Sequence, residues 1–252
     1  MIQILRQADF PNLKVDPKRV WCLLGYSDPK QVSPAIQKAF HRAMEIGPTL
    51  LEPTACYDIF PIARVTSSSV EVEGGVSFES QDLAHRFREA RELAALITTI
   101  GPGLEEQVAK LLLGGNSVVG YVLDAFGSAA VDTVAYKARE PIHGYALTKG
   151  YRAMTYGYCI GKDCPAYTDC GGSIIYWWSP GYGDCQTREQ KKLFTLVDGS
   201  HIGVHLGESC MMTPLKSYAC LLSIGPQAEK PTYECDEGQK DWSKLGILKP
   251  VK

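Results

Sequence analysis

The chain has 252 residues, enough to bury a substantial core in one large domain or two small ones. Hydrophobic residues make up 45% and charged residues 21%, and 26 basic against 28 acidic residues leave a net charge of −2. That balance argues against a protein that binds nucleic acid or a membrane surface. The sequence shows no uninterrupted apolar run of about 18 residues and no secretory leader, so we expect a soluble, cytoplasmic protein.

The first third of the chain predicts helix mixed with antiparallel sheet. Ser33–Pro34 is a typical helix start, and apolar residues at helical spacing continue from it to Gly47–Pro48. Residues 56–65 are apolar enough for a strand. Alternation on both sides of a Gly-Gly pair predicts a hairpin over residues 70–78.

The next segment predicts a buried strand surrounded by helices. Ser80 can cap a short helix, and residues 93–100 form an apolar run typical of a buried strand. Two helices follow, over 104–113 and over 116–134, where Asn116 can serve as the cap. Asp124 lies on a polar face of the second of these helices, a position that solvent exposure alone would explain.

The remainder of the chain is less regular. Periodicity disappears over 141–172, which predicts a loop or an insertion. Residues 174–178 predict a strand, and the Thr187–Gln190 segment matches a capping box that opens a helix. Two further strands are expected, over 202–206 and 218–224.

Cysteine is the unusual residue, with nine copies, an odd number. In a reducing compartment such thiols are packed, catalytic or metal-bound more often than paired. Four thiolates can hold a tetrahedral zinc or an iron–sulfur cluster, although the spacing C-x4-C-x5-C-x14-C matches no standard zinc or ferredoxin pattern. The alternative is a chance cluster of small buried thiols. The candidate metal ligands are Cys159, Cys164, Cys170 and Cys185.

A turn rich in aromatic residues follows three of these cysteines. Adjacent tryptophans before a Pro-Gly turn place aromatic faces beside open backbone amides, as a planar, cationic ligand requires. The alternative is a core strand that ends in a tight turn. The candidate ligand-binding residues in this segment are Trp177, Trp178, Ser179, Pro180, Gly181 and Tyr182.

Five short segments carry a resemblance to a known family. They are LGY at 24–26, TTIG at 98–101, LDAFGSAA at 123–130, SPGYGD at 179–184 and MTPLKS at 212–217. In this order they resemble the stand-alone form of the S-adenosylmethionine-binding activation domain of cobalamin-dependent methionine synthase. The resemblance extends along most of the chain, and SPGYGD is its most specific motif.

The resemblance implies an α/β (α+β) fold, with a twisted antiparallel sheet flanked by helices. It implies that S-adenosylmethionine lies against the Pro-Gly turn, with Asp124 near the same site. The implied activity is reductive reactivation, in which one electron and a methyl group restore methylcobalamin from cob(II)alamin. Methyl transfer from a sulfonium requires positioning and exclusion of water more than proton transfer, so we assign no catalytic acid or base.

Two departures from the family pattern fall at this site. Family members typically have arginine three residues before the proline, where it can pair with the carboxylate of the ligand. Here that position is Trp177, and losing such a pair costs about 1.5 to 3 kcal/mol. Arg152 and Lys216 are candidate substitutes. The second departure is a Cys-rich insertion at about 151–172, which we expect to carry an iron–sulfur cluster that passes an electron to the corrinoid.

The sequence therefore predicts a single domain over 1–226, followed by a polar tail over 227–252. We expect it to act in trans, as a methyltransferase component that reactivates a corrinoid methyltransferase such as methionine synthase. The implied partners are a corrinoid-binding subunit and an electron donor such as ferredoxin or flavodoxin. Two alternatives remain at this point: a non-catalytic partner that docks on a corrinoid protein, and an iron–sulfur electron carrier that uses the fold as a scaffold.

Overall fold

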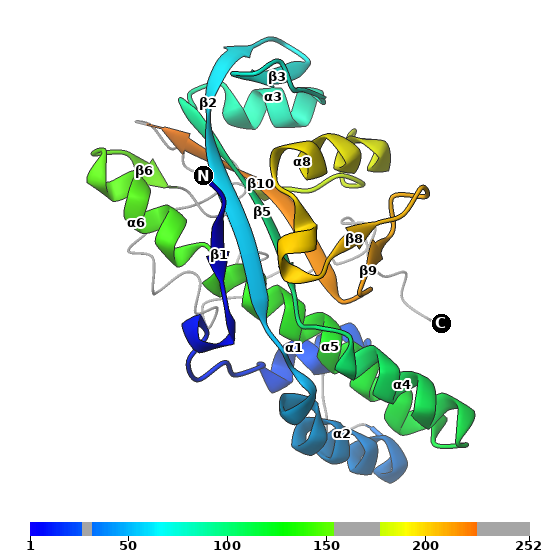
Figure 1. Cartoon of the computed structure of the whole chain (residues 1–252). Helices are drawn as coiled ribbons and strands as arrows, with labels where there is room; N and C mark the ends of the chain where they lie inside the picture. The colour runs from blue at the N-terminus through cyan, green and yellow to red at the C-terminus, as the bar shows by residue number, and fades with distance from the viewer. Residues whose placement is uncertain (27–31, 154–176, 226–252) are drawn as a thin grey trace, which may run out of the picture.

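The computed structural model describes residues 1–26, 32–153 and 177–225 (Figure 1). The polar tail and most of the predicted insertion lie outside the described residues. The strands are β1 (Gln3–Leu5), β2 (Thr54–Val65), β3 (Ser69–Val72), β4 (Ser77–Glu79), β5 (Glu92–Thr99), β6 (Arg152–Ala153), β7 (Trp177–Trp178), β8 (His205–Leu206), β9 (Met212–Thr213) and β10 (Ser217–Gly225). The α-helices are α1 (Pro17–Leu23), α2 (Pro34–Ile46), α3 (Gln81–Phe87), α4 (Gly103–Leu113), α5 (Ser117–Lys137), α6 (Glu140–Thr148) and α8 (Gln190–Leu196), and the 3-10 helices are η1 (Gln7–Asp9), η3 (Gly47–Leu50), η4 (Thr187–Glu189) and η5 (Gly199–Ile202).

The main sheet is antiparallel at every pairing, with the strand order β4-β3-β2-β5-β10-β6. β1 joins the outer side of β2, and β7 joins the outer side of β10. β2 is long enough to pair with β5 over its first part and with β3 over its last residues, where the register shifts between Ile62 and Arg64. This strand therefore bends from the main sheet into the β3–β4 hairpin at the top of Figure 1.

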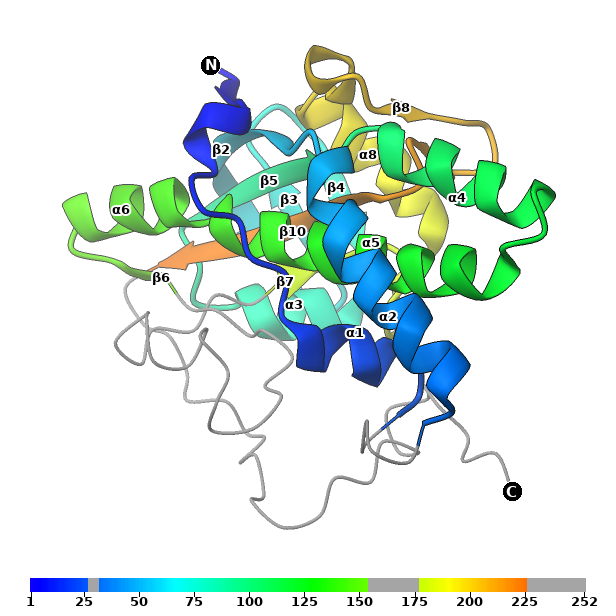
Figure 2. The same cartoon turned by 90° about the horizontal axis from the view of Figure 1, so that it is seen from below.

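β5 is the centre of the fold, because every residue from Leu93 to Thr99 is buried. Side chains alternate between the two faces of a strand, so both faces of β5 need a hydrophobic cover. One core contains residues of α1, α2, α4, α5 and α6, and the other contains residues of α3, α8 and η5. Figures 1 and 2 show these two groups of helices on opposite faces of the sheet.

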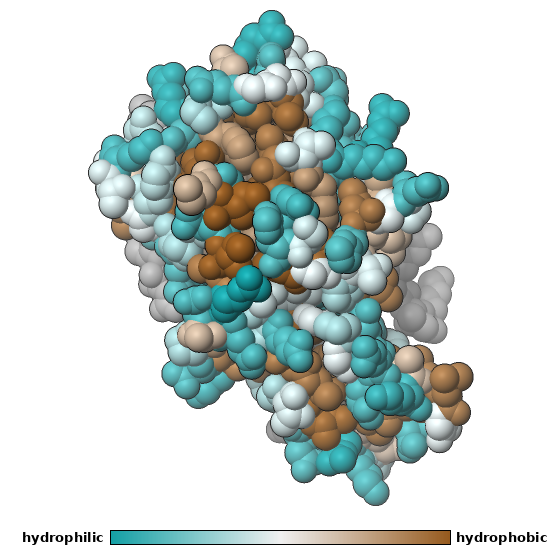
Figure 3. Space-filling view, in the orientation of Figure 1, coloured by the Kyte–Doolittle hydropathy of each residue, from teal (hydrophilic) through white to brown (hydrophobic). Residues whose placement is uncertain are grey.

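α5 is the most deeply buried helix and packs against α2, α4 and α1 as well as the sheet. By length and composition alone, the helical run over residues 117–148 could cross a membrane, but 61% of its apolar window is buried inside the protein. Core helices pass the same test, so the run is weak support for a membrane span. At the exposed end of the α4–α5 hairpin, Leu113 is 90% exposed, and apolar side chains reach the surface at the lower right of Figure 3.

Most of the elements predicted from periodicity are confirmed. α2, α3, α4, α5, the β3–β4 hairpin, β5 and β10 all lie where the sequence predicts them. The Ser80 hydroxyl accepts a hydrogen bond from Leu83 N at 3.0 Å, as expected of a cap. Ser33 and Asn116 flank their helices as predicted but make no capping bond through their side chains.

Several predictions are wrong. Residues 140–148 form α6 and not a loop, because Pro141 suits the first turn of a helix and the two buried residues, Ile142 and Ala146, pack against the core. The capping box at Thr187 does not form, since Thr187 belongs to η4 and α8 begins three residues later. The strand expected over 202–206 is reduced to β8, because the Asp198 carboxylate caps η5 over the preceding residues.

A pair of glycine substitutions tests the packing. A Cβ on Gly199 would lie 2.7 Å from the carbonyl oxygen of Val204 and 2.8 Å from Cε1 of Phe194, whereas one on Gly144 in α6 would meet nothing within 4 Å. We expect Gly199→Ala to lower the free energy of unfolding by about 1 to 3 kcal/mol. Gly144→Ala should raise it by up to about 1 kcal/mol, because alanine favours helix. Equal midpoints for the two variants in urea unfolding would contradict this packing.

Candidate functional site

β7 and the turn after it lie along the outer edge of β10, the side away from β5. Trp178 faces Leu221 in this pairing. If the ladder continued in the same register, Pro180 would face Ala219, but proline has no amide hydrogen to donate. The chain leaves the sheet here, and within the part of the chain that the structure describes no strand pairs with residues 217–220 on this edge.

The predicted turn at Ser179–Tyr182 is confirmed. Tyr182 N donates to Ser179 O at 3.2 Å, and Gly181 has a φ of +95°, as a type II turn with proline second and glycine third requires. The prediction of open backbone amides is wrong for Gly181 and Tyr182. Gly181 N bonds to Cys185 O at 3.2 Å, and Cys185 N bonds to Tyr182 O at 3.0 Å. Tyr182, which is 55% exposed, and Gly181, which is also exposed, are the parts of this turn that a ligand can reach.

The tryptophan before the turn anchors it in the core. Trp178 is 3% exposed and meets Phe78 edge to face, with the ring centroids 6.1 Å apart. Its indole Nε1 is buried and has no hydrogen-bond partner within the described residues. Ser179 and Pro180 are buried as well. Trp177 pairs with β10 through its backbone, and its side chain lies outside the description.

A hydrogen bond holds the start of the turn against β10. The Ser179 hydroxyl donates to the Tyr218 hydroxyl at 2.9 Å. Burial raises the pKa of Tyr218 well above its usual value, so this phenol stays neutral at physiological pH. The turn is therefore fixed both by the β7 pairing and by a buried polar contact between side chains.

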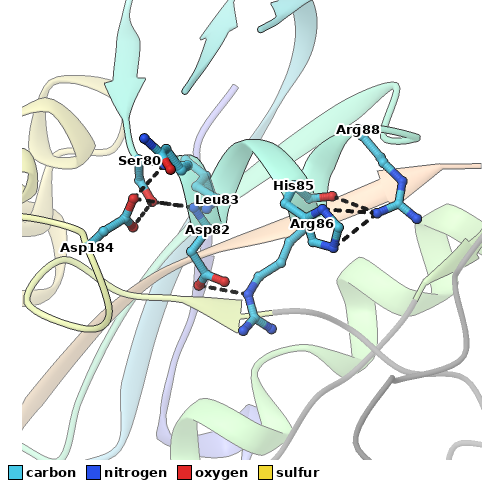
Figure 4. A network of polar contacts seen from close by, with 8 residues as sticks. Ser80, Asp82, Leu83, His85, Arg86, Arg88 and Asp184 are labelled. Carbon is cyan, nitrogen blue, oxygen red and sulfur yellow. Dashed lines mark hydrogen bonds and ion pairs between the residues drawn. The ribbon is translucent and has the colours of Figure 1, made fainter. Parts of the chain in front are cut away.

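The last residue of the SPGYGD motif ties the turn to α3 (Figure 4). Asp184 Oδ1 accepts from the Ser80 hydroxyl at 2.5 Å, and Oδ2 accepts from Gln81 N at 2.6 Å and from Asp82 N at 3.4 Å. These bonds, the Ser80 contact above all, hold the pKa of the Asp184 carboxyl below its usual value. A carboxylate at the first turn of a helix satisfies amides that have no partner within the helix.

The polar face of α5 lies beside the first residues of β10. Lys216 Nζ is 2.8 Å from Asp124 Oδ1 and 2.9 Å from the Ser128 hydroxyl oxygen. One helical turn further along, Asp132 pairs with Arg19 of α1 at 2.8 Å. Burial raises the pKa of Asp132, and Arg19 opposes that shift. The face predicted for Asp124 is thus occupied by specific ion pairs, not by solvent alone.

β10 connects this face to the turn. Lys216 immediately precedes β10 and Tyr218 lies two residues later, so about 6.6 Å separates their backbones on the same face of the strand. The charges of Asp132 in α5 and of Tyr182 in the turn both raise the pKa of the Tyr218 phenol, and its hydroxyl bonds to Ser179. The structure therefore brings Asp124 and the SPGYGD turn to one region along β10.

The predicted four-cysteine site is only partly described. Cys159, Cys164 and Cys170 lie outside the described residues. Cys185 is buried in the same core as Trp178, and burial is the main cause that raises the pKa of its thiol to about 12. Over residues 1–26, 32–153 and 177–225, no three His, Cys, Asp or Glu side chains gather to hold a metal. The metal site stays a prediction.

Sequence reasoning missed three contacts that define the site. The sequence shows Asp184 only as part of a motif, because the chain order does not reveal that Asp184 lies at the first turn of α3. Tyr218 sits in an apolar strand and shows no signal of its partner Ser179, which is far away in sequence. The sequence offers Lys216 only as a substitute cation and gives no sign of its partner Asp124. Arg152, the other candidate, lies in β6 and pairs through its backbone with Gly225 of β10, and its side chain lies outside the description.

Comparison with known proteins supports the fold. No protein family model and no curated protein matches the sequence. Among solved structures, the chain is similar to the MetH reactivation domain bound to AdoHcy, with a TM-score of 0.61 and 15% sequence identity. The similarity covers 91% of this chain and 80% of that one. The predicted fold class, an antiparallel sheet flanked by helices, is therefore confirmed.

Removing the Asp184 carboxylate tests the link between the turn and α3. Asp184→Asn should lower the free energy of unfolding at pH 7 by about 0.5 to 2 kcal/mol, because the charged cap of α3 is lost. The pKa of Asp184 is lowered by folding, so its stabilisation is complete above the unfolded pKa near 4 and fades as the pH falls below it. Denaturant unfolding of both proteins from pH 7 to pH 3 should show their stabilities converging.

Glu45→Gln is the control, because Glu45 forms an exposed pair with Arg42 and should change stability by less than about 1 kcal/mol. A gap between wild type and Asp184→Asn that stays constant down to pH 3 would show that the carboxylate charge does not stabilise the fold.

Metal analysis tests the four-cysteine site. Protein purified without oxygen should contain iron with inorganic sulfide, or zinc, if the cysteines hold a metal. Cys185→Ala should lower that metal content, whereas Cys56→Ala, a buried thiol on β2, should leave it unchanged. Protein free of iron, sulfide and zinc rules out the predicted site.

Proposed function

We propose that this protein binds S-adenosylmethionine, or its product S-adenosylhomocysteine, in the region bounded by the SPGYGD turn, β10 and the polar face of α5. The observation that supports this most is the fold: the solved MetH reactivation domain that it resembles is bound to AdoHcy. The turn that carries the most specific sequence motif is held rigidly at the edge of β10 in that fold.

The described residues suit such a ligand in two respects. The Tyr182 ring is exposed and rigidly mounted, and an aromatic face attracts both a planar base and a sulfonium cation. The side chain of Asp124 is 51% exposed, and its carboxylate can pair with the ammonium group of the ligand. The buried residues of this segment hold the turn in place and do not contact the ligand as extensively as Tyr182 does. They are Trp178, Ser179 and Pro180.

The reaction that we propose is the reactivation of a corrinoid methyltransferase in trans. Cob(II)alamin on the partner takes one electron from a donor such as ferredoxin or flavodoxin and becomes cob(I)alamin. Its cobalt then takes the methyl group from the sulfonium, which forms methylcobalamin and releases S-adenosylhomocysteine. The role of this chain is to hold the sulfonium still and to keep water away from it.

An iron–sulfur cluster or zinc on the predicted cysteine site would add a path for that electron. If this protein does not bind the ligand, the alternative function is that of a non-catalytic partner that docks on the corrinoid protein. The following experiment separates ligand binding from docking alone.

Isothermal titration with S-adenosylmethionine tests the proposed function. Wild type should bind saturably, and Gly181→Val should abolish binding, because valine cannot adopt the φ of +95° without strain and the turn must change shape. Gly115→Val is the matched control: Gly115 has a φ of +79° in the turn between α4 and α5, and a Cβ there would meet nothing within 4 Å, so it carries a similar strain away from the turn.

The free energy of unfolding should fall by a similar amount in both variants, but only Gly181→Val should fail to bind the ligand. A wild type that releases no heat with S-adenosylmethionine, yet is retained by an immobilised corrinoid methyltransferase, would favour the docking role.

A further inference from the structure

We infer that Lys216 is the cation that recognises the carboxylate of the ligand's amino acid group. The inference rests on the proposed function, since it names the residue that holds one end of the proposed ligand. The proposed ligand ends in an amino acid group, whose carboxylate needs a cation, and Lys216 is the cation that lies beside Asp124. A carboxylate that leaves water needs a replacement cation close to the rest of the site.

The position of Lys216 meets this requirement. Its Nζ bonds to Asp124, so it adjoins the carboxylate that the proposed function assigns to the ligand's ammonium group. The backbone of Lys216 continues the β10 ladder, because its carbonyl accepts from Ile100 N at 3.2 Å. Tyr218, two residues later, holds the ligand-binding turn through Ser179. One strand thus carries both the proposed cation and the support of the turn.

The hydrogen bonds of Lys216 leave it with capacity for an anion. An ammonium group has three donors, and the described partners, Asp124 and Ser128, take two of them. Ser128 donates its own hydrogen to the carbonyl oxygen of Asp124 at 3.3 Å, so its oxygen is oriented to accept from Lys216. The third donor of Lys216 is then available to a carboxylate.

Charge also favours an amino acid head group here. An amino acid carries an ammonium and a carboxylate on one carbon, and Lys216 and Asp124 present the opposite charges 2.8 Å apart. The Lys216 side chain is only 14% exposed, so its charge is screened less by water than that of a surface lysine. The pair therefore complements the head group with its positive and negative ends side by side.

The sequence of α5 makes room for this arrangement. Gly127 lies between Asp124 and Ser128, and a Cβ on it would come within 3.3 Å of Cε of Lys216 and 2.6 Å of Cδ2 of Leu104. Because Gly127 has no side chain, the aliphatic part of Lys216 can lie close to α5, and its ammonium group can reach Asp124 and Ser128.

Two other cations near the site fit the role less well. Arg19 gives two of its nitrogens to Asp132, at 3.1 Å and 2.8 Å. Arg86 pairs with Asp82 in α3, which covers the opposite face of the sheet from α5 and therefore from Asp124 (Figure 4). Arg86 nevertheless lies close to the turn, because Asp82 is 3.7 Å from the place of a Cβ on Gly183. It is therefore the proper control.

The experiment compares two ligands on matched variants. S-adenosylhomocysteine carries the amino acid head, whereas 5′-methylthioadenosine has the same nucleoside and thioether without it. In calorimetric titration, Lys216→Met should lower the affinity for S-adenosylhomocysteine by about ten- to a hundred-fold. It should leave the affinity for 5′-methylthioadenosine unchanged. Lys216→Arg should recover most of the lost affinity, and Arg86→Met should bind both ligands as wild type does.

Because Lys216→Met leaves Asp124 without its partner, the double variant Lys216→Met/Asp124→Asn and a melting curve accompany it. A folded Lys216→Met protein that binds S-adenosylhomocysteine as tightly as wild type overturns the inference and leaves the proposed function intact. An equal loss of affinity for both ligands also overturns the inference, since that result assigns Lys216 a structural role. A wild type that binds neither ligand overturns the proposed function and this inference together.

Discussion

The burial of β5 is the constraint on which the rest of the structure depends. This strand lies between β2 and β10 and is buried on both faces from Leu93 onward, so it can exist only with helices on each side of the sheet. α5 with its neighbours covers one face, and α3 with α8 covers the other. The site follows from this arrangement, because β10 lies beside β5 and carries contacts to α5 at its start and to the turn on its outer edge.

Proline at position 180 sets where the sheet ends and the site begins. Two residues of β7 pair with β10, and the next residue that could bond in the same register is the one that lacks an amide hydrogen. The chain turns there, and three different contacts then hold it: Trp178 in the core, Ser179 on Tyr218, and Asp184 on the first turn of α3. A turn with so many supports would lose little conformational entropy on binding the ligand that we propose.

The sequence could predict the parts of this account that depend on local pattern. The run of β5, the Gly-Gly hairpin and the Ser-Pro-Gly-Tyr turn each have a signature within a few residues, and each is confirmed. α6 was missed because its helix depends on burial of two side chains and not on a clear amphipathic pattern. The pairing of Lys216 with Asp124, and of Ser179 with Tyr218, joins segments that are distant in sequence, so only the folded chain reveals it.

Amide hydrogen exchange with and without S-adenosylhomocysteine tests whether the ligand binds between the SPGYGD turn and β10, because it reports where a ligand binds without any substitution. We expect the ligand to slow exchange in peptides that cover the turn at 178–185 and the first half of β10. β1, on the same sheet but separated from β10 by β2 and β5, should be unaffected. Protection that falls elsewhere, or none at a ligand concentration that saturates the structurally similar MetH reactivation domain, would contradict binding at this site.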